Sequence, residues 1–156
     1  MYTTLHPSPV GDIQLRADAE GRLTGLYLRH DGAGGDGPFD AVRGQLDAYF
    51  AGELEQFDLP LAPHGTPFQM RVWDELTRIP YGETISYMEL ALRLGDRKLV
   101  RAVGTANGRN PLSIIVPCHR VIGADGTLVG YGGGLERKRW LLEHEAVASG
   151  RRLAVG

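Results

Sequence analysis

The stretch Ser113-Ile114-Ile115-Val116-Pro117-Cys118-His119-Arg120 contains the only cysteine of the chain, directly before a histidine. Residues 113–116 are mostly β-branched and apolar, which favours a buried strand, and Pro117 ends that strand because proline has no N–H to donate to a ladder. Cys118 is therefore expected where a strand ends. A cysteine thiolate is a strong nucleophile, and an adjacent imidazole can take its proton if a carboxylate or a carbonyl orients the ring.

A cysteine beside a histidine does not by itself define an active site. Taken alone, such a pair is more often a small buried cysteine next to a surface histidine. The choice between the two interpretations therefore depends on the rest of the chain.

Length and composition limit the possible fold classes and the expected cellular compartment. The chain has 156 residues, of which 42% are hydrophobic and 23% are charged, as expected for one globular domain or a small lobe joined to a larger one. No apolar run approaches the roughly 20 residues that cross a bilayer, so no membrane partner is expected. Residues 1–4 do not resemble a secretory signal, and a single cysteine cannot form an internal disulfide, so the cytoplasm is the expected location.

Charge is distributed unevenly along the chain. Residues 1–61 carry a formal balance of −6 and residues 62–156 a balance of +4. Residues 93–109 contain a basic cluster in which Asp96 is the only acidic residue. Such a cluster suits either phosphate binding or a solvated helix face. The cluster comprises Arg93, Arg97, Lys98, Arg101 and Arg109.

Residues 1–62 are expected to form a structural lobe without chemistry of its own. Alternation within residues 3–30 predicts two or three antiparallel strands with a hairpin. Helical spacing from Phe39 to Phe50 predicts a helix that ends at Gly52, and residues 57–61 suggest another strand.

Residues 63–156 are expected to form a mainly helical lobe. Thr66-Pro67-Phe68-Gln69 is a capping box that starts one helix, and Ser86-Tyr87-Met88-Glu89 starts a short second helix that ends at Gly95. A third helix is predicted from Arg97 to about Asn107, with Gly108 as a left-handed exit. Two short helices around a glycine turn, the second of them basic, are typical of a helix-turn-helix, although helical hairpins also serve as core.

The stretch after Cys118 predicts a hairpin-like turn at residues 124–127, a glycine loop at residues 130–134 and a last helix from Arg137. The loop Gly130-Tyr131-Gly132-Gly133-Gly134 leaves room for a flat ligand beside the cysteine, and it can equally be a connector. The predicted class is α+β: a small N-terminal sheet-plus-helix lobe, then a mainly helical lobe with a helix-turn-helix and a short active-site strand.

Several linked motifs resemble the O6-alkylguanine-DNA alkyltransferases, also called methylated-DNA-protein-cysteine methyltransferases. The similarity extends in order and spacing over nearly all of residues 66–146. Its motifs are Ile79 to Tyr87, Val100 to Gly104, Asn110-Pro111, Ile115 to Gly123, Tyr131 and Leu141 to Glu145.

The resemblance implies repair by irreversible, single-turnover transfer of an alkyl group from O6-alkylguanine, and less well from O4-alkylthymine, in double-stranded DNA to Cys118. It implies that His119 acts as a base through a water, that Glu145 orients and charges the imidazole, and that Asn110 holds the turn that carries the active-site strand. Tyr87 is implied to donate a proton toward guanine N3. No cofactor is expected. No metal is expected either, because the only cysteine is already committed and His6, His30 and His64 alone do not make a credible zinc site.

DNA contacts and the base pocket follow from the same resemblance. Arg101 is implied to enter the base stack and replace the nucleotide that is flipped out. The expected DNA-contacting residues are Tyr87, Lys98, Arg101, Ala102, Thr105 and Arg120. The expected pocket residues are Ser113, Val121, Tyr131, Gly132 and Gly133, and the small side chains at positions 113 and 132 suggest tolerance of alkyl groups larger than methyl. A monomer is expected, and clustering on DNA is left open.

Two other functions compete with alkyl transfer as interpretations of this sequence. A thiol hydrolase also uses Cys, His and a carboxylate, but it predicts turnover on esters or peptides. A lesion sensor or a helix-turn-helix regulator predicts binding alone. Non-catalytic relatives lack the cysteine, and its presence here favours transfer.

Overall fold

The computed structural model describes residues 1–30, 32 and 34–150. The described residues form two compact units, of which the first comprises Met1–His64 with Pro111–Ile115 and the second comprises Gly65–Asn110 with residues 116–150. The fold is α+β, as predicted. Segment 111–115, which was expected in the second lobe, belongs to the first unit.

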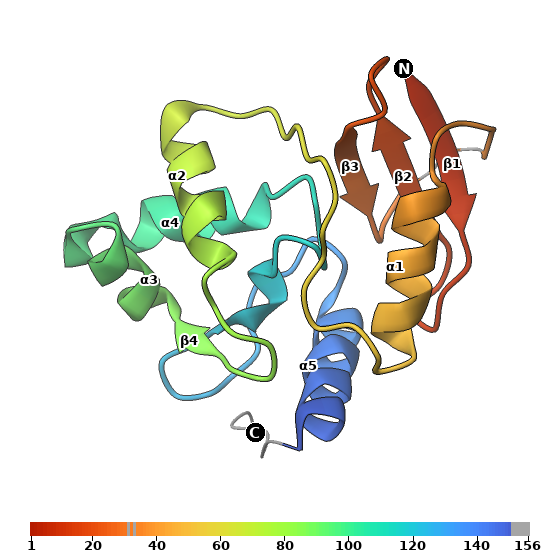
Figure 1. Ribbon diagram of the computed structural model, residues 1–156. Helices are drawn as coiled ribbons and strands as arrows, with labels where there is room; N and C mark the ends of the chain where they lie inside the picture. Colours follow the sequence, from red (N-terminus) through yellow and green to blue (C-terminus); the bar gives the residue numbers. More distant parts are fainter. Residues whose placement is uncertain (31, 33, 151–156) are drawn as a thin grey trace. The chain divides into compact units, whose positions relative to one another are not determined.

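The first unit is built on a three-stranded antiparallel sheet in the order β1-β2-β3 (Figure 1). Its strands are β1 (Tyr2–His6), β2 (Ile13–Ala17) and β3 (Leu23–Tyr27). Ile13, Leu15 and Leu26 are fully buried, as expected from the sequence, although burial in β2 does not strictly alternate because Gln14 is only 2% exposed.

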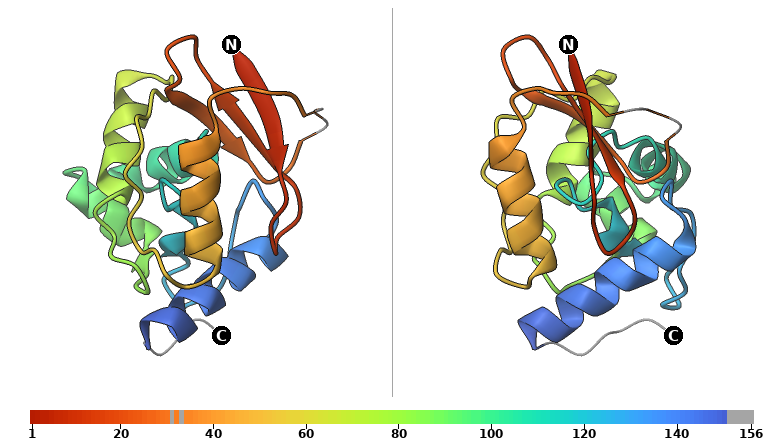
Figure 2. Two further views of the ribbon diagram at one scale, coloured as in Figure 1. Left: turned by 45° about the vertical axis from the view of Figure 1, so that its right-hand side comes forward. Right: turned by 90° about the vertical axis from the view of Figure 1, so that its right-hand side faces the viewer.

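Helix α1 (Asp40–Phe50) lies along one face of this sheet (Figure 2). Val42, Leu46 and Tyr49 form its buried stripe. Arg43 joins the helix to β1, because its guanidinium donates to the Leu5 carbonyl at 3.1 Å and to Thr4 Oγ1 at 2.8 Å. The predicted helix is thus confirmed.

Two predicted strands are wrong. Residues 57–61 form only an isolated bridge, between Leu61 and Leu23. In segment 111–115 Leu112 bridges Leu26, and Ile114 then adopts a positive φ of 73°, a conformation that turns the chain and is uncommon for a β-branched residue. The run before Cys118 therefore makes a short contact with β3 instead of a strand.

The second unit is mainly helical (Figure 1). A short parallel pair of strands, β4 (Ile85–Ser86) and β5 (Val121–Ile122), connects two distant parts of it. Its helices are α2 (Pro67–Leu76), α3 (Tyr87–Arg93), η1 (Arg97–Leu99), α4 (Val100–Gly108), η2 (Cys118–Arg120) and α5 (Leu135–Ser149), where η denotes a 3₁₀ turn.

Helix caps in this unit follow the sequence closely. Thr66 Oγ1 accepts from the Gln69 N–H at 3.1 Å, and Gln69 Oε1 accepts from the Thr66 N–H at 2.9 Å, which completes the predicted capping box. Ser86 Oγ accepts from the Glu89 N–H at 3.0 Å, as predicted for the second helix. Gly95 has φ 114°, the left-handed region expected of a residue that ends a helix.

Three details differ from the sequence-based expectation. The predicted helix from Arg97 begins as the 3₁₀ turn η1, because Asp96 caps the Lys98 N–H and tightens the first turn. Gly108 is not left-handed, since the Arg109 N–H still bonds to the Thr105 carbonyl at 3.1 Å. Residues 123–127 form a tight turn without a hairpin, because β5 pairs with β4.

The core of the second unit forms where α4 packs against α2 and α3. Val72, Leu90 and Val103 are fully buried there, and Trp73 Nε1 donates to the Ala106 carbonyl at 2.8 Å. The short helix η2 contacts both α2 and α5. Among the described residues, no helix is long and apolar enough to cross a bilayer.

Candidate active site

Cys118 begins η2 and is held by the turn that precedes it. Pro117 has φ −81° and ψ 63°, and the Cys118 N–H bonds to the Val116 carbonyl at 2.8 Å, so residues 116–118 form an inverse γ-turn. Asn110 Nδ2 donates to the same Val116 carbonyl at 2.7 Å. The thiol is 4% exposed and therefore lies just below the surface, in a 3₁₀ turn instead of at a strand end.

His119 is fully buried and paired with a carboxylate from α5. Its Nε2 lies 2.7 Å from Glu145 Oε2, which fixes Nε2 as the protonated nitrogen when the ring is neutral. The other ring nitrogen, Nδ1, has no hydrogen-bond partner within the described part of the chain. It is thus the atom that can accept a proton.

Arg120 completes the charge arrangement around Glu145. Its Nε donates to Glu145 Oε1 at 2.8 Å, its Nη2 to Glu145 Oε2 at 3.1 Å and its Nη1 to the Ile79 carbonyl at 2.8 Å. The Tyr81 ring lies 5.5 Å from the guanidinium carbon. Arg120 was expected to contact DNA, and that expectation is corrected: the side chain is buried and bonded inside the unit.

The environment fixes the protonation states of this cluster. Burial alone would raise the pKa of Glu145, but His119 and Arg120 outweigh it and hold that pKa far below its usual range. Burial lowers the pKa of His119 although Glu145 opposes the shift. Near neutral pH, Glu145 is therefore a carboxylate and His119 a neutral imidazole, which is the state of a base ready to take a proton.

Tyr87 lies near the cysteine, at the start of α3. Its hydroxyl donates to the Val129 carbonyl at 3.1 Å. Burial, and then the negative charge on an ionised Cys118, raise the pKa of Tyr87 above its ordinary value. The phenol therefore keeps its proton at neutral pH and can serve as a hydrogen-bond donor.

Two buried residues that the sequence did not single out also belong to this region. Asn107 is 2% exposed and its Nδ2 lies 3.4 Å from the Cys118 carbonyl. Lys138, on α5, is 0% exposed. Helical periodicity could have indicated that both are buried, because Asn107 shares a helix face with Val103 and Lys138 shares one with Glu145.

The predicted pocket residues divide between the two units. Val121 is buried in β5, directly after η2. Tyr131 and Gly132 lie in the loop before α5, and the carbonyl of Gly133 accepts from Arg137 Nη1 at 2.9 Å. Ser113 belongs to the first unit, in segment 111–115.

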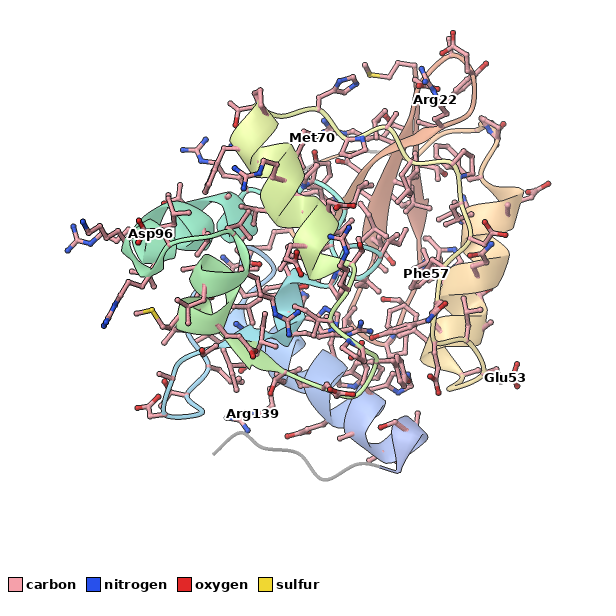
Figure 3. All side chains as sticks on the ribbon, turned by 60° about the vertical axis from the view of Figure 1, so that its left-hand side comes forward. Arg22, Glu53, Phe57, Met70, Asp96 and Arg139 are labelled. Atoms are coloured by element: carbon pink, nitrogen blue, oxygen red, sulfur yellow. The ribbon has the colours of Figure 1, made fainter. Side chains whose placement is uncertain are left out.

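The exposed face of α4 carries the remaining predicted residues. Arg101, Ala102 and Thr105 are exposed, whereas Val103 and Ala106 on the other side are buried. Lys98 is exposed on η1, after the turn at Asp96 (Figure 3). Within the described residues four exposed bases of this region lack an acidic partner: Arg97, Lys98, Arg101 and Arg109.

No three His, Cys, Asp or Glu side chains gather as a metal site in the part of the chain that the structure describes. The reactive groups that the site does contain are the thiol of Cys118, the imidazole of His119 and the phenol of Tyr87, with charged groups beside them.

Comparison with known proteins gives concordant results for both halves of the chain. Residues 67–147 match the model of the 6-O-methylguanine DNA methyltransferase DNA binding domain, and residues 1–63 match that of the ribonuclease-like domain of the same family. A methylated-DNA--protein-cysteine methyltransferase of Methanosarcina acetivorans is 48% identical over 153 residues, which covers 93% of this chain and 98% of that protein.

A solved structure extends the similarity to three dimensions. Mycobacterium tuberculosis OGT in complex with DNA superimposes with a TM-score of 0.87 at 48% identity, over 95% of this chain and 94% of that chain. The matched domains, the sequence identity and the shared fold agree, and the chain belongs to the 6-O-methylguanine DNA methyltransferase family.

Proposed function

We propose that this protein repairs double-stranded DNA by moving the alkyl group of O6-alkylguanine onto its own Cys118, once per molecule. The observation that carries the proposal is the buried thiol next to a neutral His119, which Glu145 holds by one ring nitrogen. This arrangement supplies a nucleophile, a base and an orienting group in the order that covalent catalysis requires.

In the proposed step, Cys118 Sγ forms a bond to the alkyl carbon while the bond from that carbon to guanine O6 breaks. His119 Nδ1 takes the thiol proton through a water molecule, and the electron pair of the broken bond passes to the guanine. Tyr87 donates toward guanine N3 as this charge develops, which acts like an oxyanion hole. The repaired guanine stays in the DNA and takes up one proton in place of the alkyl group, while His119 gives up the proton it received, so atoms and charge balance.

Attack at an sp³ carbon must be in line with the leaving oxygen, and a base inside a duplex does not offer that approach. The damaged nucleotide therefore has to be flipped out, at a cost of a few kcal/mol. Arg101 stands on the exposed face of α4 and is proposed to fill the space left in the stack. The basic residues around it suit the phosphates on either side.

The reaction is proposed to be irreversible. The product is a thioether, which has no good leaving group, and the chain has no second cysteine to restore the thiol. A reduced compartment that contains DNA suits such a protein, and we place it in the cytoplasm as a monomer on its substrate.

A pocket that admits groups larger than methyl is also proposed. A Cβ added at Gly132 would lie 3.8 Å from the Gly108 carbonyl oxygen, so the glycine leaves open a volume that a side chain could occupy. Transfer rates from O6-benzylguanine and O4-methylthymine in duplex DNA test this point. Complete failure with benzyl would contradict it.

Intact mass spectrometry after incubation with an O6-methylguanine duplex is the direct test. The protein should gain one methyl group, located on Cys118 by peptide mapping, and C118S should gain none. An unchanged mass would overturn the proposal. A thiol hydrolase would instead turn over an activated ester many times.

A further inference from the structure

Lys138 is a buried lysine to which the proposed transfer mechanism assigns no role. It is 0% exposed on α5, although lysine side chains usually reach solvent. Its Nζ donates to the Val121 carbonyl at 2.6 Å and to the Val129 carbonyl at 3.0 Å. The ammonium thus ties the residue after η2 to the start of the glycine loop.

The Val129 carbonyl accepts from two donors. Lys138 Nζ is one, and the Tyr87 hydroxyl is the other at 3.1 Å. The ammonium also lies 5.9 Å from the centre of the Tyr87 ring. Anything that moves Lys138 should therefore alter the position of the phenol that is proposed to donate to the leaving guanine.

Lys138 is also electrostatically coupled to the thiol. Burial lowers the pKa of Lys138 to about 8, and a negative charge on Cys118 opposes that shift. Its charge lowers the pKa of His119 as well. The other charged side chains of η2 and α5 in this cluster, Arg120 and Glu145, are bonded to each other.

We propose that Lys138 is a positioning residue of the transfer site, which fixes the carbonyl shared with Tyr87 and supplies the buried positive charge that favours the Cys118 thiolate. A buried cation beside a thiol favours the ionised form, which is the nucleophile. The inference deepens the proposed function and rests on it for the transfer step, but the coupling between Lys138 and Cys118 can be measured without DNA.

The wild-type protein offers a direct test because its sequence contains two lysines, Lys98 and Lys138. With lysine labelled with ¹³C at Cε, an NMR titration should resolve two signals, and the exposed Lys98 serves as an internal reference. The Lys138 signal should titrate near pH 8. In C118S its midpoint should move to lower pH, because the thiolate that stabilises the ammonium is absent.

The variant K138M tests the effect on the thiol. Labelling of Cys118 by iodoacetamide and methyl transfer near pH 7 should each fall about tenfold, because loss of the buried cation lowers the fraction of the thiol that is ionised. The pH profile of labelling should move to higher pH, and K138R should recover part of both rates. R139M is the matched control, since Arg139 is a neighbour on α5 with an exposed side chain (Figure 3).

Two results would overturn the inference. One is an unchanged Lys138 midpoint in C118S. The other is a folded K138M, judged by its unfolding transition, that labels and transfers at the wild-type rate. If K138M does not fold, the wild-type and C118S titrations decide. A wild-type protein that gains no mass from damaged DNA would contradict the proposed function alone, because titration and labelling use no DNA.

Discussion

Glu145 Oε2 lies 2.7 Å from His119 Nε2, and both side chains are almost completely excluded from solvent. The same carboxylate accepts from Arg120, so one anion compensates a buried guanidinium and orients a buried imidazole. A buried ion pair does not guarantee stability, but removal of one partner leaves an uncompensated charge. Glu145 is therefore expected to matter for both folding and chemistry.

E145Q tests both contributions, one by the rate of transfer and the other by unfolding. The amide keeps the shape of the side chain but cannot hold His119 in the required tautomer, so transfer from an O6-methylguanine duplex should fall about 10²- to 10⁴-fold in single-turnover kinetics. Leaving Arg120 without its anion should lower the free energy of unfolding by about 3–5 kcal/mol. E143Q is the control, because Glu143 is exposed on the same helix. Equal transfer rates for E145Q and wild type would contradict the assigned role.

Acid should destabilise the protein in two stages. The folded-state pKa values of His119 and Glu145 both lie below their ordinary values. The unfolded chain therefore takes up protons first, on histidine below about pH 6.5 and on glutamate below about pH 4.3, and the stability that these groups contribute is lost as the pH falls. Urea unfolding between pH 8 and pH 3 measures this. The lower stage should shrink in E145Q, and an unchanged pH dependence would show that Glu145 is not its source.

Two asparagine side chains donate to backbone carbonyls at or just before the reactive cysteine. Asn110 donates to the Val116 carbonyl at 2.7 Å, whereas the Asn107 contact with the Cys118 carbonyl is 3.4 Å long. N110A should therefore lower the free energy of unfolding by about 1–3 kcal/mol and slow transfer, because it leaves a buried carbonyl without this donor. N107A should cost less in urea unfolding. The opposite order would show that the turn does not depend on Asn110.

Local signals in the sequence predicted the parts of this fold that depend on neighbouring residues. Thr66 and Ser86 cap their helices as expected, because a cap involves residues only three apart. The strand predicted before Cys118 is wrong because Ile114 turns the chain, shortly after Leu112 bridges Leu26, a residue that is distant in the sequence. Local propensity does not contain that information.

The burial of individual charged residues, in contrast to the helix caps, could not be predicted from their neighbours in the sequence. Arg120 follows the reactive pair directly and was assigned to DNA, but its partner Glu145 lies 25 residues further along the chain. Lys138 stands between two arginines and looks like surface charge, yet the helix turns it inward with Glu145. Burial of a charge depends on tertiary packing. The family resemblance paired His119 with Glu145, but the sequence indicated no partner for Arg120 or Lys138.

Arg101 provides a test of nucleotide flipping. It is exposed on α4 and has no acidic partner within the described residues, so R101A should leave the fold and the thiol chemistry intact. If the guanidinium fills the gap left in the stack, its loss raises the cost of extruding the base, a cost that the free modified base does not incur. Repair of O6-methylguanine in a duplex should therefore slow more than the reaction with free O6-benzylguanine.

The same variant separates insertion from simple phosphate contact. Loss of one phosphate contact weakens binding to all sequences and reduces the salt slope of binding by about 1, with or without a lesion. R78A is the control, since Arg78, two residues after the end of α2, is exposed and already paired with Asp74 at 2.8 Å. Equal loss by R101A on the duplex and on the free base would show that Arg101 does not flip the nucleotide. A selective loss on the duplex, larger than any change in binding, would support insertion into the stack.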